Sequence, residues 1–107
     1  MNEFGLDPNE QDIIRSVFRR HPEVAEARVF GSRAKGNAGP ASDVDIVLSG
    51  VTSHALLARI MGELDELPLP YRFDVTADEL LQHAPLRGHI ERVGRVFYQR
   101  ETTTATP

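Results

Sequence analysis

The chain has 107 residues, the size of a single domain with one modest hydrophobic core. Its formal net charge of −4 disfavours a surface that grips a nucleic-acid backbone, so we expect any bound nucleotide to be small and no direct nucleic-acid binding. Absence of cysteine excludes disulfides, thiolate metal sites and cysteine nucleophiles, and the lack of a long apolar run predicts no membrane span and a cytoplasmic protein.

The first predicted element is an amphipathic helix that begins after Asp7. Asp7 is a favourable N-cap and Pro8 suits the first helical position, while Pro22 ends the run. A buried strand is expected over residues 25–30, directly before Gly31. The helix should bury the apolar residues that recur at helical spacing, which are Ile13, Ile14, Val17 and Phe18.

A glycine-rich stretch, Gly31-Ser32-Arg33-Ala34-Lys35-Gly36, follows this strand. We expect a short helical turn over residues 32–35 and then a loop as far as Ser42. Such a turn after a strand can present backbone N–H groups and a hydroxyl to an anion. Arg33 and Lys35 could hold phosphates through charge-assisted hydrogen bonds or could be solvated, and the sequence leaves both readings open.

Two carboxylates open the next predicted strand, over residues 43–49. Asp43 and Asp45 are two positions apart, so their side chains should share one face of the strand, about 6 to 7 Å apart. Carboxylates at this spacing can converge on one divalent cation or flank two. The structural alternative is a solvated strand face, where Asp-x-Asp is common.

A third strand predicted over residues 71–76 adds one more acid. It follows a helix that we expect to begin after Ser53 and to end before Pro68, and its alternation places Asp74 on the polar side. Three acids on one face repel one another, and a bound cation would relieve the repulsion. The predicted metal ligands and catalytic acids are therefore Asp43, Asp45 and Asp74.

The C-terminal part is predicted to be helical, and the structure of its last residues, 94–98, is left undecided. Asp78 can cap a short helix through Gln82, and Pro85 can start another. Residues 94–98 could continue that helix or leave it as a short extended segment, and both remain open. We expect one domain over residues 1–101 and a disordered tail over 102–107. The element order indicates an α+β fold of two layers, a small mixed sheet with helices packed on one face.

The glycine-rich motif together with Ser42-Asp43-x-Asp45 resembles the signature of the nucleotidyltransferase superfamily that is similar to DNA polymerase beta. The small size resembles its minimal nucleotidyltransferase (MNT) branch. The likeness covers residues 29–76, and residues 90–98 resemble the family's terminal helix. The predicted helix before residue 29 resembles the family only in being a helix.

The resemblance implies a Mg²⁺-dependent nucleotidyltransferase that uses ATP. Asp43 and Asp45 would bind Mg²⁺, and Asp74 would be the third acid, which helps to activate the attacking hydroxyl. Phosphoryl chemistry requires little more than such positioning and charge neutralisation. The nucleotide-binding positions would be Gly31, Ser32, Arg33, Lys35 and Ser42.

The MNT branch further implies a toxin–antitoxin pair with a HEPN ribonuclease from the adjacent gene. In that pairing the MNT protein is a protein adenylyltransferase that transfers AMP from ATP to a tyrosine of the toxin. Two alternatives remain. One is a non-catalytic antitoxin that neutralises its partner by contact, and the other is a nucleotidyltransferase for a small molecule such as an antibiotic, which would require an acceptor-binding domain.

Overall fold

A computed structural model describes residues 3–31, 43–80 and 94–100 of the chain. The predicted helical turn over 32–35, the helix from Pro85 and the tail over 102–107 lie outside these ranges. The elements, in chain order, are the 3-10 helix η1 (Glu3–Gly5), helix α1 (Pro8–Arg19), strands β1 (Glu26–Phe30) and β2 (Val44–Ser49), helix α3 (His54–Asp65), strand β3 (Phe73–Ala77), the 3-10 helix η2 (Asp78–Leu80) and strand β4 (Arg95–Gln99).

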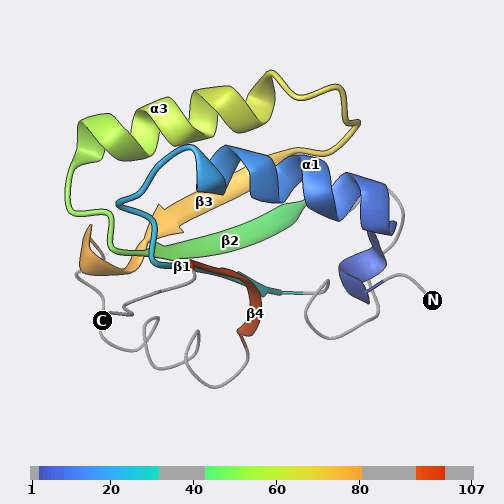
Figure 1. The fold of residues 1–107 in the computed structure, drawn as a ribbon, viewed down its shortest axis with the longest axis horizontal. Coiled ribbons are helices and arrows are strands. Elements are labelled where there is room, and N and C mark those ends of the chain that lie inside the picture. The colour runs from blue at the N-terminus through green and yellow to red at the C-terminus, as the bar shows by residue number, and fades with distance from the viewer. Residues whose placement is uncertain (1–2, 32–42, 81–93, 101–107) are drawn as a thin grey trace, which may run out of the picture.

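The described strands form one mixed sheet in the order β3-β2-β1-β4. Strand β1 is antiparallel to both β2 and β4, whereas β2 and β3 are parallel. Both α1 and α3 lie on the same face of this sheet (Figure 1). The predicted two-layer α+β fold, with helices packed on one face of a small mixed sheet, is confirmed. Within the described residues, no helix is long and apolar enough to cross a membrane.

Helix α1 begins with a complete capping box, as the sequence predicts for Asp7. The Asp7 carboxylate accepts a hydrogen bond from the backbone N–H of Glu10 at 2.8 Å, and the Glu10 carboxylate accepts one from the backbone N–H of Asp7 at 3.1 Å. These two bonds satisfy N–H groups that have no partner inside the helix. The Tyr71 hydroxyl also donates to Glu10 at 3.0 Å, so the cap is joined to the segment before β3.

Replacing Asp7 with alanine should therefore lower the free energy of unfolding by about 1 kcal/mol, the usual cost of losing an N-cap. Urea denaturation would measure the change. Asp12→Ala is the matched control, because Asp12 pairs across the exposed surface with Arg19 at 3.3 Å and such pairs contribute little. Equal losses in the two variants would contradict the assigned role of the cap.

The core lies between the two helices and the sheet. Strand β2 buries Val44, Ile46 and Leu48 as predicted and leaves Asp45 half-buried, but Val47, on the same side of the strand as Asp45, is buried as well. Strand β3 alternates as predicted, with Phe73 and Val75 buried. The fully buried large side chains of the core, at less than 2% exposure, include Ile14, Val17, Phe18, Val29, Ile46, Leu48, Ile60 and Leu64.

Strand β4 resolves the alternatives that the sequence leaves open for residues 94–98. The segment is extended, and its pairing with β1 shifts register between Ala27 and Arg28. Phe97 and Tyr98 are consecutive, yet both contact Phe18 of α1, with ring centroids 6.4 and 5.6 Å away. A bulge explains this, because an extra residue lets two neighbouring side chains turn toward the helices.

Candidate active site

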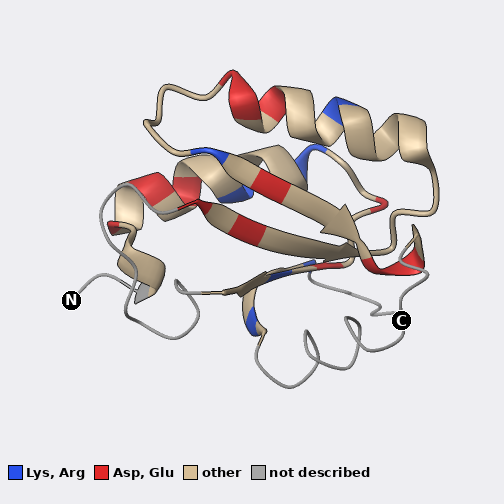
Figure 2. Ribbon diagram, turned by 180° about the vertical axis from the view of Figure 1, so that it is seen from behind, with Lys and Arg blue, Asp and Glu red and all other residues tan. Residues whose placement is uncertain are grey.

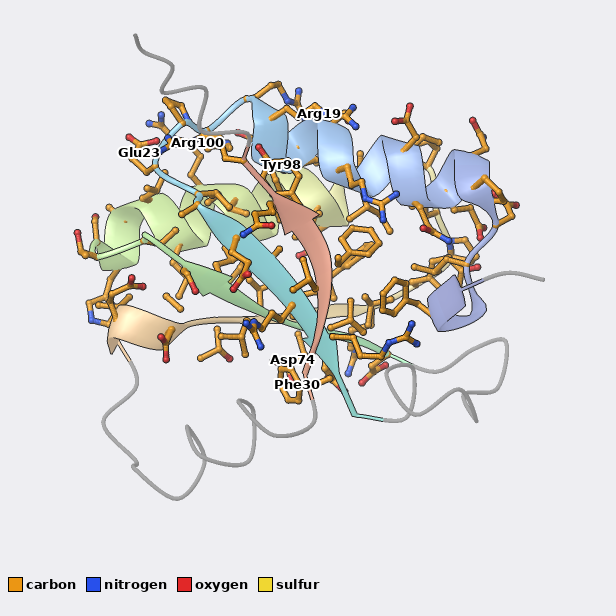
Figure 3. The ribbon with its side chains drawn as sticks, turned by 60° about the horizontal axis from the view of Figure 1, so that its bottom comes forward. Arg19, Glu23, Phe30, Asp74, Tyr98 and Arg100 are labelled. Carbon is orange, nitrogen blue, oxygen red and sulfur yellow. The ribbon has the colours of Figure 1, made fainter. Side chains whose placement is uncertain are left out.

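A row of three side chains crosses the sheet on the face turned away from the helices. Phe30 of β1 is paired with Asp45 of β2, and Asp45 is paired with Asp74 of β3. Since neighbouring strands lie about 4.7 to 4.9 Å apart, the two carboxylates are immediate neighbours. Figure 2 shows one acidic position on each of these two strands, and Figure 3 shows Phe30 and Asp74 at the same end of the sheet.

Strand alternation places both carboxylates on this face. Asp45 lies between Val44 and Ile46, and Asp74 lies between Phe73 and Val75, all four of which are buried toward the helices. Alternate side chains of a strand point to opposite faces, so both aspartates must face the other way. Asp45 is half-buried and Asp74 is exposed. Asp45 and Asp74 therefore each lie on the polar side of their strand, as the alternation predicts.

Asp43 lies one residue before β2 and is exposed. It is two positions from Asp45, and a face shared with Asp45 stays a prediction because Asp43 is outside the strand. Across residues 3–31, 43–80 and 94–100, no three His, Cys, Asp or Glu side chains come together as a group that could hold a metal ion. A metal site made of Asp43, Asp45 and Asp74 together stays a prediction.

The pair of adjacent carboxylates nevertheless suits Mg²⁺. Mg²⁺ is a hard cation that prefers oxygen ligands, and proteins usually hold it with one or two carboxylates while the substrate phosphates and water supply the rest. Asp45 and Asp74 supply two carboxylates side by side on neighbouring strands. Like charges at paired positions of adjacent strands repel each other, and a cation bound between them would reduce the repulsion.

Gly31, at the end of β1, lies against the Asp45 carboxylate. A Cβ atom at this position would come within 2.6 Å of Asp45 Oδ2, closer than atoms approach without displacement. The backbone of Gly31 also has a φ of +77°, a conformation that side chains disfavour. The positive φ favours glycine here, and the missing Cβ leaves room for the Asp45 carboxylate to lie against the main chain.

Gly31→Ala should therefore lower the free energy of unfolding by about 1 to 2 kcal/mol and displace Asp45. Mg²⁺-dependent ATP binding, measured by calorimetry, should fall with it. Gly62→Ala is the matched control, because Gly62 lies inside α3, where an added Cβ would have no atom within 4 Å, and it has no positive φ. That change should raise stability by about 0.5 to 1 kcal/mol. Unaltered stability and ATP binding in Gly31→Ala would contradict this description.

The other predicted nucleotide-binding residues, Ser32, Arg33, Lys35 and Ser42, lie outside the described residues, so their roles stay predictions. The sequence motifs do not identify Phe30, the third residue of the row, as part of the site. They assign Phe30 only to the end of a buried strand, but it is half-buried and lies beside Asp45 on the face turned away from α1 and α3. The alternation of Ala27 and Val29, both buried, is the signal that places Phe30 on that face.

A family model described as "Polymerase beta, Nucleotidyltransferase" matches residues 12–103. The match begins inside α1 and spans all the later elements as far as β4, including the row that contains Asp45 and Asp74. No curated protein matches the sequence.

Several solved structures share the fold at low sequence identity. The crystal structure of a toxin–antitoxin with AMP-PNP has a TM-score of 0.70 and 17% identity, with 85% of this chain and 74% of that chain covered. A mutant toxin–antitoxin that contains MntA has a TM-score of 0.67 and 14% identity over 85% of this chain and 74% of that chain. The toxin–antitoxin MntA–HepT has a TM-score of 0.56 and 15% identity over 84% and 70%. At these identities the likeness establishes the fold.

Proposed function

This chain belongs to the polymerase beta nucleotidyltransferase family, and from that membership we propose that it transfers AMP from ATP to a protein acceptor. The observation that carries the proposal is the pair of carboxylates, Asp45 and Asp74, on paired positions of neighbouring strands, with Gly31 in contact with Asp45. Adjacent carboxylates suit a cation that accompanies a triphosphate, and a glycine turn after a strand is a common place for phosphate to approach the main chain.

Asp43 and Asp45 are the proposed Mg²⁺ ligands, with Asp74 as the third acid. When bound, Mg²⁺ supplies charge neutralisation at the phosphates and a lower pKa for a coordinated hydroxyl. The carboxylates keep their oxygen atoms on one face of the sheet, because β2 and β3 fix their backbone positions. Gly31 and Ser32, with Arg33, Lys35 and Ser42, are the proposed contacts of the triphosphate.

The proposed reaction is an in-line displacement at the α-phosphorus of ATP. The acceptor hydroxyl oxygen forms the new bond to phosphorus, and the bond from the α-phosphorus to the bridging oxygen of the β-phosphate breaks. Pyrophosphate leaves, and the hydroxyl proton passes to the Asp74 carboxylate. Asp74, the exposed carboxylate at the end of the row, can reach a hydroxyl on a second protein, as general base catalysis requires.

The proposed acceptor is a tyrosine of a HEPN-type toxin encoded by the adjacent gene, which makes this chain an antitoxin. The support is the shared fold with the toxin–antitoxin structures, one of which was solved with AMP-PNP. The present chain covers 74% of the chain in that AMP-PNP structure.

A second candidate is an antitoxin that neutralises its partner by contact and transfers nothing. One observation favours it, since the described residues contain no group of three potential ligands that could hold a metal. On this alternative the acids have no catalytic role, and removing Asp43 or Asp45 would leave neutralisation unchanged.

Labelling experiments with ATP separate the two candidates. The chain, Mg²⁺ and the product of the adjacent gene are incubated with ATP labelled at the α-phosphate or at the γ-phosphate. AMP transfer predicts label on the partner from the α-position only, because the γ-phosphate departs with pyrophosphate. Chelation of Mg²⁺ or the change Asp43→Ala should abolish the label. Full labelling by Asp43→Ala would refute the metal assignment, and an unlabelled but neutralised partner would establish contact alone.

A further inference from the structure

A groove lies between the C-terminal half of α1 and strand β4. It encloses about 490 Å³ and is lined by Arg15 and Arg19 of α1, by Pro22, and by residues 97–100. Figure 3 shows Arg19, Tyr98 and Arg100 gathered at this end of the molecule. Three of the lining side chains are arginines, although the whole chain carries a net charge of −4. We call this surface the arginine groove.

Two of its arginines are fixed by hydrogen bonds to backbone carbonyls. Arg15 Nε donates to the carbonyl oxygen of Phe97 at 2.7 Å, and its guanidinium lies 4.4 Å from the centre of the Phe97 ring. Arg100 donates through one terminal nitrogen to the carbonyl oxygen of Pro22. A guanidinium has five N–H donors, so each of these contacts holds the group in place and leaves donors for a ligand.

The third arginine, Arg19, is held among the described residues by an exposed ion pair that a ligand can replace. Arg19 pairs with Asp12 at 3.3 Å, and both side chains are more than half exposed, at 53% and 70%. Exposed ion pairs of this kind contribute little, so an incoming carboxylate can replace Asp12 at small cost. For Arg15 and Arg100, no ion pair with an acid occurs among the described residues.

The charge and shape of the groove select an anionic protein segment over a nucleic acid. Guanidinium groups bind carboxylates in bidentate pairs, and arginine and tyrosine are enriched where proteins bind proteins. A nucleic-acid backbone carries a long, continuous line of charge, so the net charge of −4 disfavours it more than it disfavours a short segment with a few carboxylates.

Strand β4 gives the groove an extended wall. It is the last strand of the order β3-β2-β1-β4 in the described part of the chain, so its outer edge faces the groove. One edge carbonyl, that of Phe97, is already occupied by Arg15. Recognition here would therefore rely on the side chains of the groove more than on a continuous strand pairing.

We propose that the arginine groove docks an acidic, extended segment of the protein partner. The identity of that partner rests on the proposed function, whereas the chemistry of the groove does not. Strand β1 separates β4 from β2, and strand alternation places Asp45 and Asp74 on the face away from α1 and α3. A segment seated in the groove leaves Asp45 and Asp74 open to the acceptor hydroxyl.

The test compares two double variants of the full chain. Arg19→Glu with Arg100→Glu changes the groove, and Arg59→Glu with Arg72→Glu makes the same charge change at exposed arginines outside it. Affinity for the product of the adjacent gene is measured by interferometry. The groove variant should bind at least about tenfold more weakly, and the control should bind nearly as wild type. Equal weakening in both variants, or none in the groove variant, would overturn the proposal.

A competition experiment needs no variant and so does not depend on folding. Hexaglutamate should displace the partner from the wild-type chain, whereas hexaglutamine should not. Failure of hexaglutamate to compete overturns the proposal, as does stronger competition by an RNA hexamer, which would indicate a nucleic-acid site.

The proposed function can fail separately. If the product of the adjacent gene neither binds nor becomes labelled, the proposed function is wrong. The groove proposal is then tested alone by direct binding of hexaglutamate, which the wild-type chain should bind and the groove variant should not. If Asp74→Asn binds the partner but transfers no label, while the groove variant binds as wild type, the function stands and the groove proposal falls.

Discussion

Replacing Asp74 with asparagine should lower AMP transfer about 10²- to 10⁴-fold, the range expected for loss of a general base, without unfolding the protein. Asp74 is exposed, and no described residue donates a hydrogen bond to it, so little structure depends on its charge. Its neighbour across the parallel pairing is Asp45. Removing one of two adjacent like charges should raise the free energy of unfolding by up to about 1 kcal/mol.

Initial rates of label transfer measure the loss of AMP transfer, and urea denaturation measures the change in the free energy of unfolding. Asp65→Asn is the matched control, because Asp65 is an exposed aspartate at the C-terminal end of α3, in the helical layer and not on the face that carries the row. Its replacement should leave transfer unchanged. An Asp74→Asn variant that transfers AMP at the wild-type rate would contradict the catalytic role, and one that unfolds would assign Asp74 to structure.

Phe18→Ala should have the largest effect on stability, with a loss of about 3 to 5 kcal/mol. Phe18 is 0% exposed, and its ring lies 6.4 Å from that of Phe97 and 5.6 Å from that of Tyr98. It joins α1 to β4, so its loss leaves a cavity between a helix and the last strand of the sheet. Domains are commonly stable by about 5 to 15 kcal/mol, so this variant should be close to unfolding.

Thermal and urea denaturation would measure the loss, with Val96→Ala as the control on the same strand. Val96 is 47% exposed, and truncating it should change the free energy of unfolding by no more than about 0.5 kcal/mol. Similar losses in both variants would show that β4 contributes no specific packing to the core.

The sequence is sufficient to predict features that depend on local pattern. Asp7 caps α1 and Ser53 caps α3 as expected, because a cap requires only the residues of one helical turn. The faces of β2 and β3 follow from alternation, so the sequence alone places Asp45 and Asp74 on the polar side of their strands.

Features that depend on pairing between distant segments could not be predicted in the same way. The direct register of Asp45 with Asp74 and the approach of Gly31 to Asp45 need the strand order and the offsets of the sheet. The bulge that turns both Phe97 and Tyr98 toward α1 has no sequence pattern of its own, so the sequence leaves residues 94–98 open between helix and strand. The arginine groove likewise joins α1 to β4, which are more than 70 positions apart in the chain.

The intact mass of the partner after incubation with ATP and Mg²⁺ tests the central claim most directly. The account predicts that the wild-type chain adds the mass of one or more AMP groups to the product of the adjacent gene, and that Asp45→Asn adds none. A partner that is neutralised at unchanged mass, or one that gains the same mass from Asp45→Asn, would contradict it.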